Sequence, residues 1–309
     1  MLLWNVSSCF ENENELFSMD NYIFKKINEG FDREKRVLTF TDDNEHILNT
    51  SLNLKPTVGR IFSVDLNRYI TTYSIFRRIK DTKRNGDANP VLYALKGEND
   101  WEFSSLYNRN MFWERFKVLL KRFLNDHRNE FDTTIVIPSS NRLNSDFVKE
   151  IEKLAKEVGI THISNGGLQT VSTQKVEDAA YAKDSYFRKY WGNRWYEKFK
   201  LLQDYLDDMD KYNDGYFKYH MIDNKSGLRK SIINTMEVDT THSLLYRKNI
   251  NDKNVLLVDD SITFGQSIKN AIHAIAEVYK PKSVSVLTMF SSLYDDNDNI
   301  YSDFNAIYA

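Results

Sequence analysis

The sequence has little cysteine, proline or glycine, and it has no long apolar run. Cys9 is the only cysteine in 309 residues, which excludes an internal disulfide and any zinc site built from several cysteines. Four prolines and 11 glycines leave little material for flexible linkers. No run of about 18 apolar residues occurs, and the short apolar start lacks a basic region, so we expect neither a membrane span nor a signal peptide. These features favour a cytoplasmic protein.

The charge is nearly balanced, with a net charge of −2 at pH 7. The whole molecule is therefore not a basic nucleic-acid binder. Aromatic residues make up 14% and hydrophobic residues 41%, which predicts a packed core rather than disorder. A length of 309 residues favours two domains, or one domain with large insertions.

Apolar patterns with the periods of strands and helices alternate along the chain. Strands are expected at 133–137, 160–164, 242–249, 254–260 and 282–290, and strands or short buried runs at 57–66 and 89–96. Helices are expected at 111–128, 145–159 and 267–280. This alternation predicts an α/β fold with a mostly parallel sheet flanked by helices.

The chain is expected to divide near residue 130. Residues 1–130 would form an N-terminal hood or partner-binding region, and 131–309 a core with a helical insertion at about 169–225. The insertion is rich in aromatic and basic residues, which favours core packing but leaves base stacking open. A lid over the site and a plain packing role are equally compatible with it.

An acid pair stands after the apolar run 254–258, before a short loop and a helix-like pattern. Ligands of parallel sheets bind beyond the carboxyl ends of the strands, where Asp259 and Asp260 are expected on a turn. Adjacent carboxylates repel each other, so they suit a ligand with hydroxyl donors or a divalent cation. The amides at the start of the following helix suit a phosphate. The segment therefore predicts a sugar-phosphate site that continues through Ser261, Thr263, Phe264, Gly265, Gln266 and Ser267.

The acid pair is also compatible with two other interpretations. A response-regulator receiver also has paired acids after its first strand, but only 49 residues follow Asp260, too few for such a domain. A strand–turn–helix with a chance acid pair stays open, because short motifs give false positives.

A second candidate site follows the strand at 133–137. Its loop offers small hydroxyls, backbone amides and a guanidinium, which suit a pyrophosphate group. The residues are Ser139, Ser140, Asn141 and Arg142. By itself the loop is an ordinary polar turn; beside the acid-pair loop, a pyrophosphate site is favoured.

The segment 255–267, VLLVDDSITFGQS, resembles the phosphoribosyl pyrophosphate loop of type I phosphoribosyltransferases. In that family the acid pair holds the ribose hydroxyls, and the loop wraps the 5′-phosphate. Thr263, Gly265 and Ser267 match loop positions, whereas Phe264 stands where a second threonine is usual. The chain is most similar to the ComF-type, competence-associated branch, on further segments at 89–97, 135–159 and 228–238, the last with Arg229. The four-cysteine zinc module of that branch is absent.

The resemblance implies an enzyme that binds phosphoribosyl pyrophosphate with Mg²⁺ and transfers ribosyl phosphate to a nitrogen acceptor. Asp259 and Asp260 would also serve the metal, directly or through ribose hydroxyls and water. The alternative is a non-catalytic sensing or effector module of the same fold that acts with a DNA-processing partner, as in bacterial defence or a toxin–antitoxin pair. A protein partner and a homodimer stay open, and a basic run at 77–84 gives weak support for nucleic acid.

Overall fold

The computed structural model describes strands at 23–27 and 35–39 and residues 57–63, 65–77, 90–97, 101–138, 142–212, 215–218, 221–222, 226–262 and 265–291. The chain divides into two compact units. One comprises 1–55 and 76–119, and the other comprises 56–75 and 120–309. Most of the basic run at 77–84 lies outside the described residues.

The first unit contains a small sheet and a short helix. Its elements are β1 (Ile23–Ile27), β2 (Lys35–Thr39), α2 (Pro90–Lys96), β5 (Trp101–Phe103) and most of α3 (Leu106–Asp126), as far as Leu119. β2 pairs antiparallel with β1 and parallel with β5. The strand or buried run expected at 89–96 is a helix. Pro90 is its first residue, a position where a proline loses no hydrogen bond, and Val91, Leu92 and Leu95 are buried.

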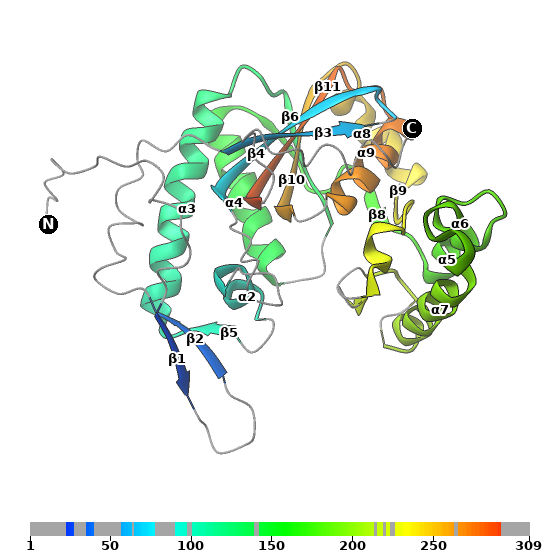
Figure 1. Ribbon diagram of the computed structural model, residues 1–309. Helices are drawn as coiled ribbons and strands as arrows, with labels where there is room; N and C mark the ends of the chain where they lie inside the picture. The colour runs from blue at the N-terminus through cyan, green and yellow to red at the C-terminus, as the bar shows by residue number, and fades with distance from the viewer. Residues whose placement is uncertain are drawn as a thin grey trace, which may run out of the picture. The chain divides into compact units, whose positions relative to one another are not determined.

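The second unit is built around a six-stranded sheet in the order β3-β4-β11-β10-β6-β7 (Figure 1). The strands are β3 (Thr57–Ser63), β4 (Arg68–Arg77), β6 (Thr133–Val136), β7 (Thr161–Ile163), β10 (Asn254–Ile262) and β11 (Ser283–Ser291). β7, β6, β10 and β11 run parallel, and β3 and β4 form an antiparallel pair beside β11. The predicted α/β class with a mostly parallel sheet is confirmed.

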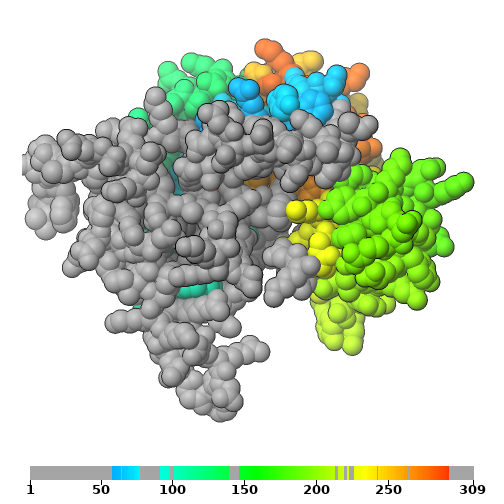
Figure 2. Space-filling view, in the orientation of Figure 1, coloured from blue at the N-terminus to red at the C-terminus, as the bar shows by residue number. Residues whose placement is uncertain are grey.

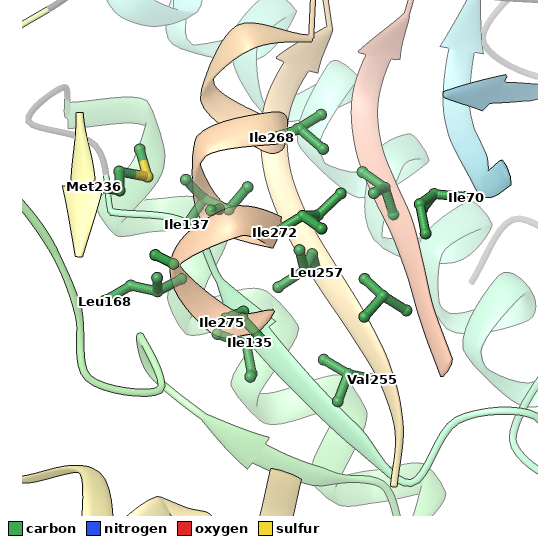
Figure 3. Close-up of a cluster of buried hydrophobic side chains, with 14 of the residues drawn as sticks. Ile70, Ile135, Ile137, Leu168, Met236, Val255, Leu257, Ile268, Ile272 and Ile275 are labelled. Carbon is green, nitrogen blue, oxygen red and sulfur yellow. The ribbon is translucent and has the colours of Figure 1, made fainter. Parts of the chain in front are cut away.

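Two helices connect the parallel strands. α4 (Arg142–Val158) joins β6 to β7, and α9 (Gln266–Val278) joins β10 to β11. α9 lies over the sheet face that carries Ile135, Val255 and Leu257, and it packs its own Ile268, Ile272 and Ile275 there (Figure 3). Because side chains alternate along a strand, the buried Leu256 and Val258 face the opposite side of the sheet.

The segment expected as a strand at 242–249 is a helix instead. α8 (Thr240–Ile250) begins after Asp239, whose carboxylate accepts a hydrogen bond from the Thr241 amide at 2.9 Å. Leu244 and Leu245, which suggested a buried strand, are 71% and 68% exposed. The N-cap at Asp239 therefore favours a helix here, and the two leucines do not mark a buried strand. A separate antiparallel pair, β8 (Leu168–Thr170) and β9 (Met236–Val238), precedes it.

The segment between β8 and β9 is largely helical, as expected. It contains α5 (Thr173–Tyr181), α6 (Tyr186–Trp191), the short 3₁₀ helix η3 (Gly192–Arg194), α7 (Trp195–Tyr212) and the 3₁₀ helix η6 (Leu228–Lys230). Gly192, which directly follows α6, has a left-handed φ of 51°, which glycine adopts without strain. The segment packs a hydrophobic cluster of its own around Phe187, Phe199, Leu202 and Leu206.

None of the helices in the described part of the chain combines the length and the apolar character needed to cross a membrane.

Candidate functional site

The strand order of the parallel sheet reverses between β6 and β10. The chain leaves β6 through α4 toward β7 on one side, and it leaves β10 through α9 toward β11 on the other. In open α/β sheets, the crevice for a ligand lies at such a reversal, beyond the carboxyl ends of the two strands. The segment 261–267 follows the acid pair of β10, and the segment 139–142 follows β6. The carboxyl ends of the two strands, which pair with each other, therefore lie at the same edge of the sheet.

The acid pair lies within β10 rather than on an exposed turn, because the strand continues to Ile262. β6 ends at Val136, which pairs with Val258, so Asp259 and Asp260 directly follow that pairing. On the other side, Asp259 faces Thr288 of β11. The two aspartates are only 6% and 5% exposed. The expectation of an exposed pair was wrong, because β11 extends the pairing beyond β6.

Burial makes the acid pair costly to maintain. Moving a charged carboxylate from water into the protein interior costs several kcal/mol of solvation free energy unless other groups compensate it. Asp259 Oδ1 accepts a hydrogen bond from the Asp260 amide at 2.8 Å, and Asp260 Oδ1 accepts one from the Ser261 hydroxyl at 2.8 Å. These bonds fix one oxygen of each carboxylate in place. The structure therefore holds two oriented acids beside the reversal of strand order.

The N-cap of α9 lies five residues beyond the pair. Gly265 is its N-cap, with a left-handed φ of 70° and no side-chain hydrogen bond to the first turn. A Cβ at this position would lie 3.2 Å from Ile61 Cδ1, so both the backbone angle and the space require glycine. Gln266 and Ser267 begin the helix with half-buried side chains. Thr263 and Phe264 lie outside the described residues.

The segment with Arg229 packs against the start of α9. Gln266 Nε2 donates to the Lys230 carbonyl at 3.2 Å, and Asn270 Oδ1 accepts from the Thr235 amide at 3.3 Å. Arg229 itself donates from Nε to the Ile222 carbonyl at 2.7 Å. The structure thus brings the 228–235 stretch beside the predicted phosphate loop. It also shows that part of the Arg229 guanidinium holds the local backbone.

The pyrophosphate candidates are only partly described. Ser139, Ser140 and Asn141 lie outside the described residues, whereas Pro138 precedes them, two residues after the end of β6. α4 begins at Arg142, three residues before the helix start expected at Ser145. Arg142 is therefore the first residue of a helix and not a loop residue. This places it at a helix N-terminus, which favours anions.

Sequence reasoning overlooked three polar residues, two in β11 and one in α9. Thr288 and Ser291 of β11 are buried at 0% and 1% exposure, and they pair with Asp259 and Ile262. Lys269 lies in the second turn of α9, where burial lowers its pKa to about 8. The hydroxyls at the end of the last strand were a visible signal, whereas the burial of Lys269 depends on tertiary packing.

No group of three or more His, Cys, Asp or Glu side chains that could hold a metal ion occurs among the described residues. Mg²⁺, however, commonly binds one or two carboxylates and takes its remaining ligands from substrate phosphates and water. Two adjacent carboxylates suit such a substrate-dependent metal.

No protein-family model, curated protein or solved structure gives a significant match to this chain.

Proposed function

We propose that the chain is a phosphoribosyltransferase-like protein that binds phosphoribosyl pyrophosphate, or a related sugar phosphate, with Mg²⁺. One observation is central. The acid pair lies near the carboxyl end of a parallel strand at the reversal of strand order, and Gly265, the N-cap of helix α9, follows Asp260 by five residues. Carboxylates for sugar hydroxyls and amides for a phosphate thus occur on one strand–loop–helix unit.

The acid pair and the loop take different parts of the ligand. Asp259 and Asp260 accept hydrogen bonds from the ribose hydroxyls. These bonds are strong because the acceptors are charged carboxylates. The amides between Phe264 and Ser267 hold the 5′-phosphate at the start of α9. The loop after β6, with Arg142 at the start of α4, holds the pyrophosphate group.

Mg²⁺ would be held by Asp259 and Asp260, directly or through ribose hydroxyls and water. When bound, it supplies positive charge to the pyrophosphate oxygens.

The proposed reaction moves a ribosyl phosphate group. The bond from C1 of the ribose to the pyrophosphate oxygen breaks, its electron pair leaves with pyrophosphate, and a nitrogen lone pair of the acceptor forms the new bond to C1. The sugar gains positive charge on the way, so the carboxylates that hold its hydroxyls also stabilise that charge. The acceptor loses its proton to solvent or to a basic group. The protein belongs to the glycosyltransferase class on this proposal.

Calorimetric titration with phosphoribosyl pyrophosphate and Mg²⁺ tests the binding site. Asp259→Asn and Asp260→Asn should each weaken binding about 10- to 100-fold, because a hydrogen bond to a charged group contributes about 1.5–3 kcal/mol. Asp208→Asn, on the exposed surface of α7, is the matched control and should bind as the wild type does. Unchanged affinity in the folded double Asn variant would refute the assignment.

A turnover assay separates the enzyme from the alternative. Release of pyrophosphate in the presence of nitrogen nucleophiles supports a transferase. Tight, Asp259-dependent binding without turnover supports the sensing or effector module. Phe264, which stands where a threonine is usual in the family, also favours this role. No binding of phosphoribosyl pyrophosphate would contradict both proposals.

A further inference from the structure

The aromatic side chains of the helical segment α5–α7 divide between its core and its surface. Phe187 and Phe199 are 2% and 3% exposed and pack in the hydrophobic cluster of the segment. Tyr181 and Tyr196 are 55% and 53% exposed. In Figure 2 the spheres of this segment, coloured green, lie open to the viewer. Core packing thus explains the phenylalanines and leaves the exposed tyrosines unexplained.

An arginine and three aromatic rings form an ordered stack on this surface. The guanidinium carbon of Arg188 lies 3.7 Å from the centre of the Trp195 ring and 5.0 Å from that of Tyr181. Trp195 also makes an edge contact with Tyr196, with ring centres 5.5 Å apart. We call Tyr181, Arg188, Trp195 and Tyr196 the aromatic–arginine stack. Because its members already hold one another, a ligand would order few further side chains on binding.

Arg188 is held by rings and not by an acid. Its Nε atom is buried and has no hydrogen-bond partner among the described residues. A guanidinium stacked on an indole keeps its charge, and such a stack is typical of surfaces that recognise planar or anionic groups.

The stack lies in a basic stretch. Between residues 181 and 200 the basic residues are Lys183, Arg188, Lys189, Arg194, Lys198 and Lys200, and the acids are Asp184 and Glu197. Glu197 is paired with Arg194 at 3.2 Å. Lys198 lies 5.0 Å from the Trp191 ring centre and Lys200 lies 5.0 Å from that of Tyr196. Positive charge and exposed rings therefore occupy the same surface.

α7 carries charges of both signs at each end. Glu197 in its first turn and Lys211 in its last turn agree with the helix dipole. Lys198 and Lys200 lie in the N-terminal part, whereas Asp204, Asp207, Asp208 and Asp210 lie in the C-terminal half. The dipole does not stabilise the two lysines, and their charge fits an anionic ligand.

We propose that the aromatic–arginine stack and its surrounding lysines bind single-stranded nucleic acid. Unpaired bases would stack on Tyr181 and Tyr196, and the phosphates would contact Lys198, Lys200 and neighbouring basic residues. Paired bases cannot offer their faces in this way, so a duplex fits less well. A membrane surface also fits less well, because the exposed large hydrophobic residues in the described part of α5–α7 are tyrosines alone, without leucine or phenylalanine.

The test uses the full chain and fluorescently labelled dT20 and U20 oligonucleotides in anisotropy titrations. Tyr181→Ala combined with Tyr196→Ala should weaken binding about 25-fold or more, because each stacked base contributes about fivefold or more. Tyr212→Ala combined with Tyr216→Ala is the matched control, since these tyrosines are 66% and 52% exposed in the same segment but lie outside the basic stretch. The control should leave binding unchanged.

Salt dependence gives a second measurement. Lys198→Ala combined with Lys200→Ala should lower the slope of log affinity against log salt by about 1.4, because each contact to a single strand contributes about 0.7. Circular dichroism of each variant confirms that the helices are intact.

Three results would overturn the proposal: absence of binding to both oligonucleotides, equal losses in the two tyrosine pairs, or preferential binding of a matched duplex. Vesicles that contain about a third phosphatidylserine test the membrane alternative. If the protein binds them more strongly than it binds the oligonucleotides, and if the Tyr181 and Tyr196 changes abolish this binding, the surface binds a membrane instead. Failure of either kind leaves the phosphoribosyl pyrophosphate site untouched, because the two sites share no residue.

Discussion

Lys269 allows a quantitative test of how tightly the start of α9 is packed. Burial lowers the pKa of its ammonium to about 8 from 10.5. The folded protein therefore binds this proton less tightly than the unfolded chain does. Between pH 8 and 10.5 the unfolded chain holds more protons, so the contribution of Lys269 to the free energy of unfolding rises with pH in this window.

Replacing Lys269 with methionine keeps the unbranched stem and removes the charge. The pKa shift corresponds to a penalty of about 3 kcal/mol at pH 7 that falls to about 1 kcal/mol at pH 9.5. Lys269→Met should therefore be more stable than the wild type at pH 7 by about 3 kcal/mol, and this advantage should fall to about 1 kcal/mol at pH 9.5.

Urea unfolding followed by circular dichroism at pH 7 and pH 9.5 measures both quantities. Lys280→Met, at an exposed position after α9, is the control and should follow the wild type at both pH values. The decisive quantity is the change with pH in the difference between Lys269→Met and the wild type. If that difference is the same at both pH values, Lys269 is not desolvated and the packing described for α9 is wrong.

Two further predictions concern the turn after β7, and both are checked by thermal or urea unfolding. Gly166→Ala should cost more than Gly159→Ala. Both glycines have left-handed φ angles, worth about 1–2 kcal/mol for any other residue, but only at Gly166 would the new Cβ also lie 3.1 Å from Ile135 side-chain atoms. If the two substitutions lower the free energy of unfolding equally, the turn at Gly166 or the Ile135 side chain shifts to make room for the new Cβ. Tyr279→Phe should cost about 1–2 kcal/mol, because the buried Tyr279 hydroxyl donates to the Gly166 carbonyl at 3.1 Å; a neutral result would show that water replaces this bond.

Local pattern was sufficient for the elements around the site. The β-branched run at 133–137 and the apolar run at 254–258 are buried strands, and the helical period after residue 266 gives α9. The two short runs contain β-branched residues and end at loop or polar residues, which favours strands, and the longer helical period of α9 favours a helix. Gly159, expected to end α4, has a left-handed φ of 83°, and the Ile160 amide bonds back to Ala155 at 2.9 Å.

Local pattern failed where a short segment fits two structures. The segments at 89–96 and 242–249 were predicted as strands or buried runs and are helices, because Pro90 and Asp239 act at their N-terminal ends. Their apolar residues are too few to distinguish the two periods. Arg142 was assigned to a loop for a similar reason. The first turn of its helix contains one apolar residue, Leu143, which is too little to show a helical period.

The sequence by itself determined the acid pair, the glycine and the helix that follows, since these are neighbours along the chain. Only the tertiary structure decided that β10 lies between β6 and β11, that the strand order reverses beside the acid pair, and that β3 and β4 join the same sheet. It also decided that Asp259 and Asp260 are buried, because burial there depends on β11, which is distant in sequence. Pairing between distant strands is set by the summed packing of two sheet faces, a quantity that no short window of sequence contains.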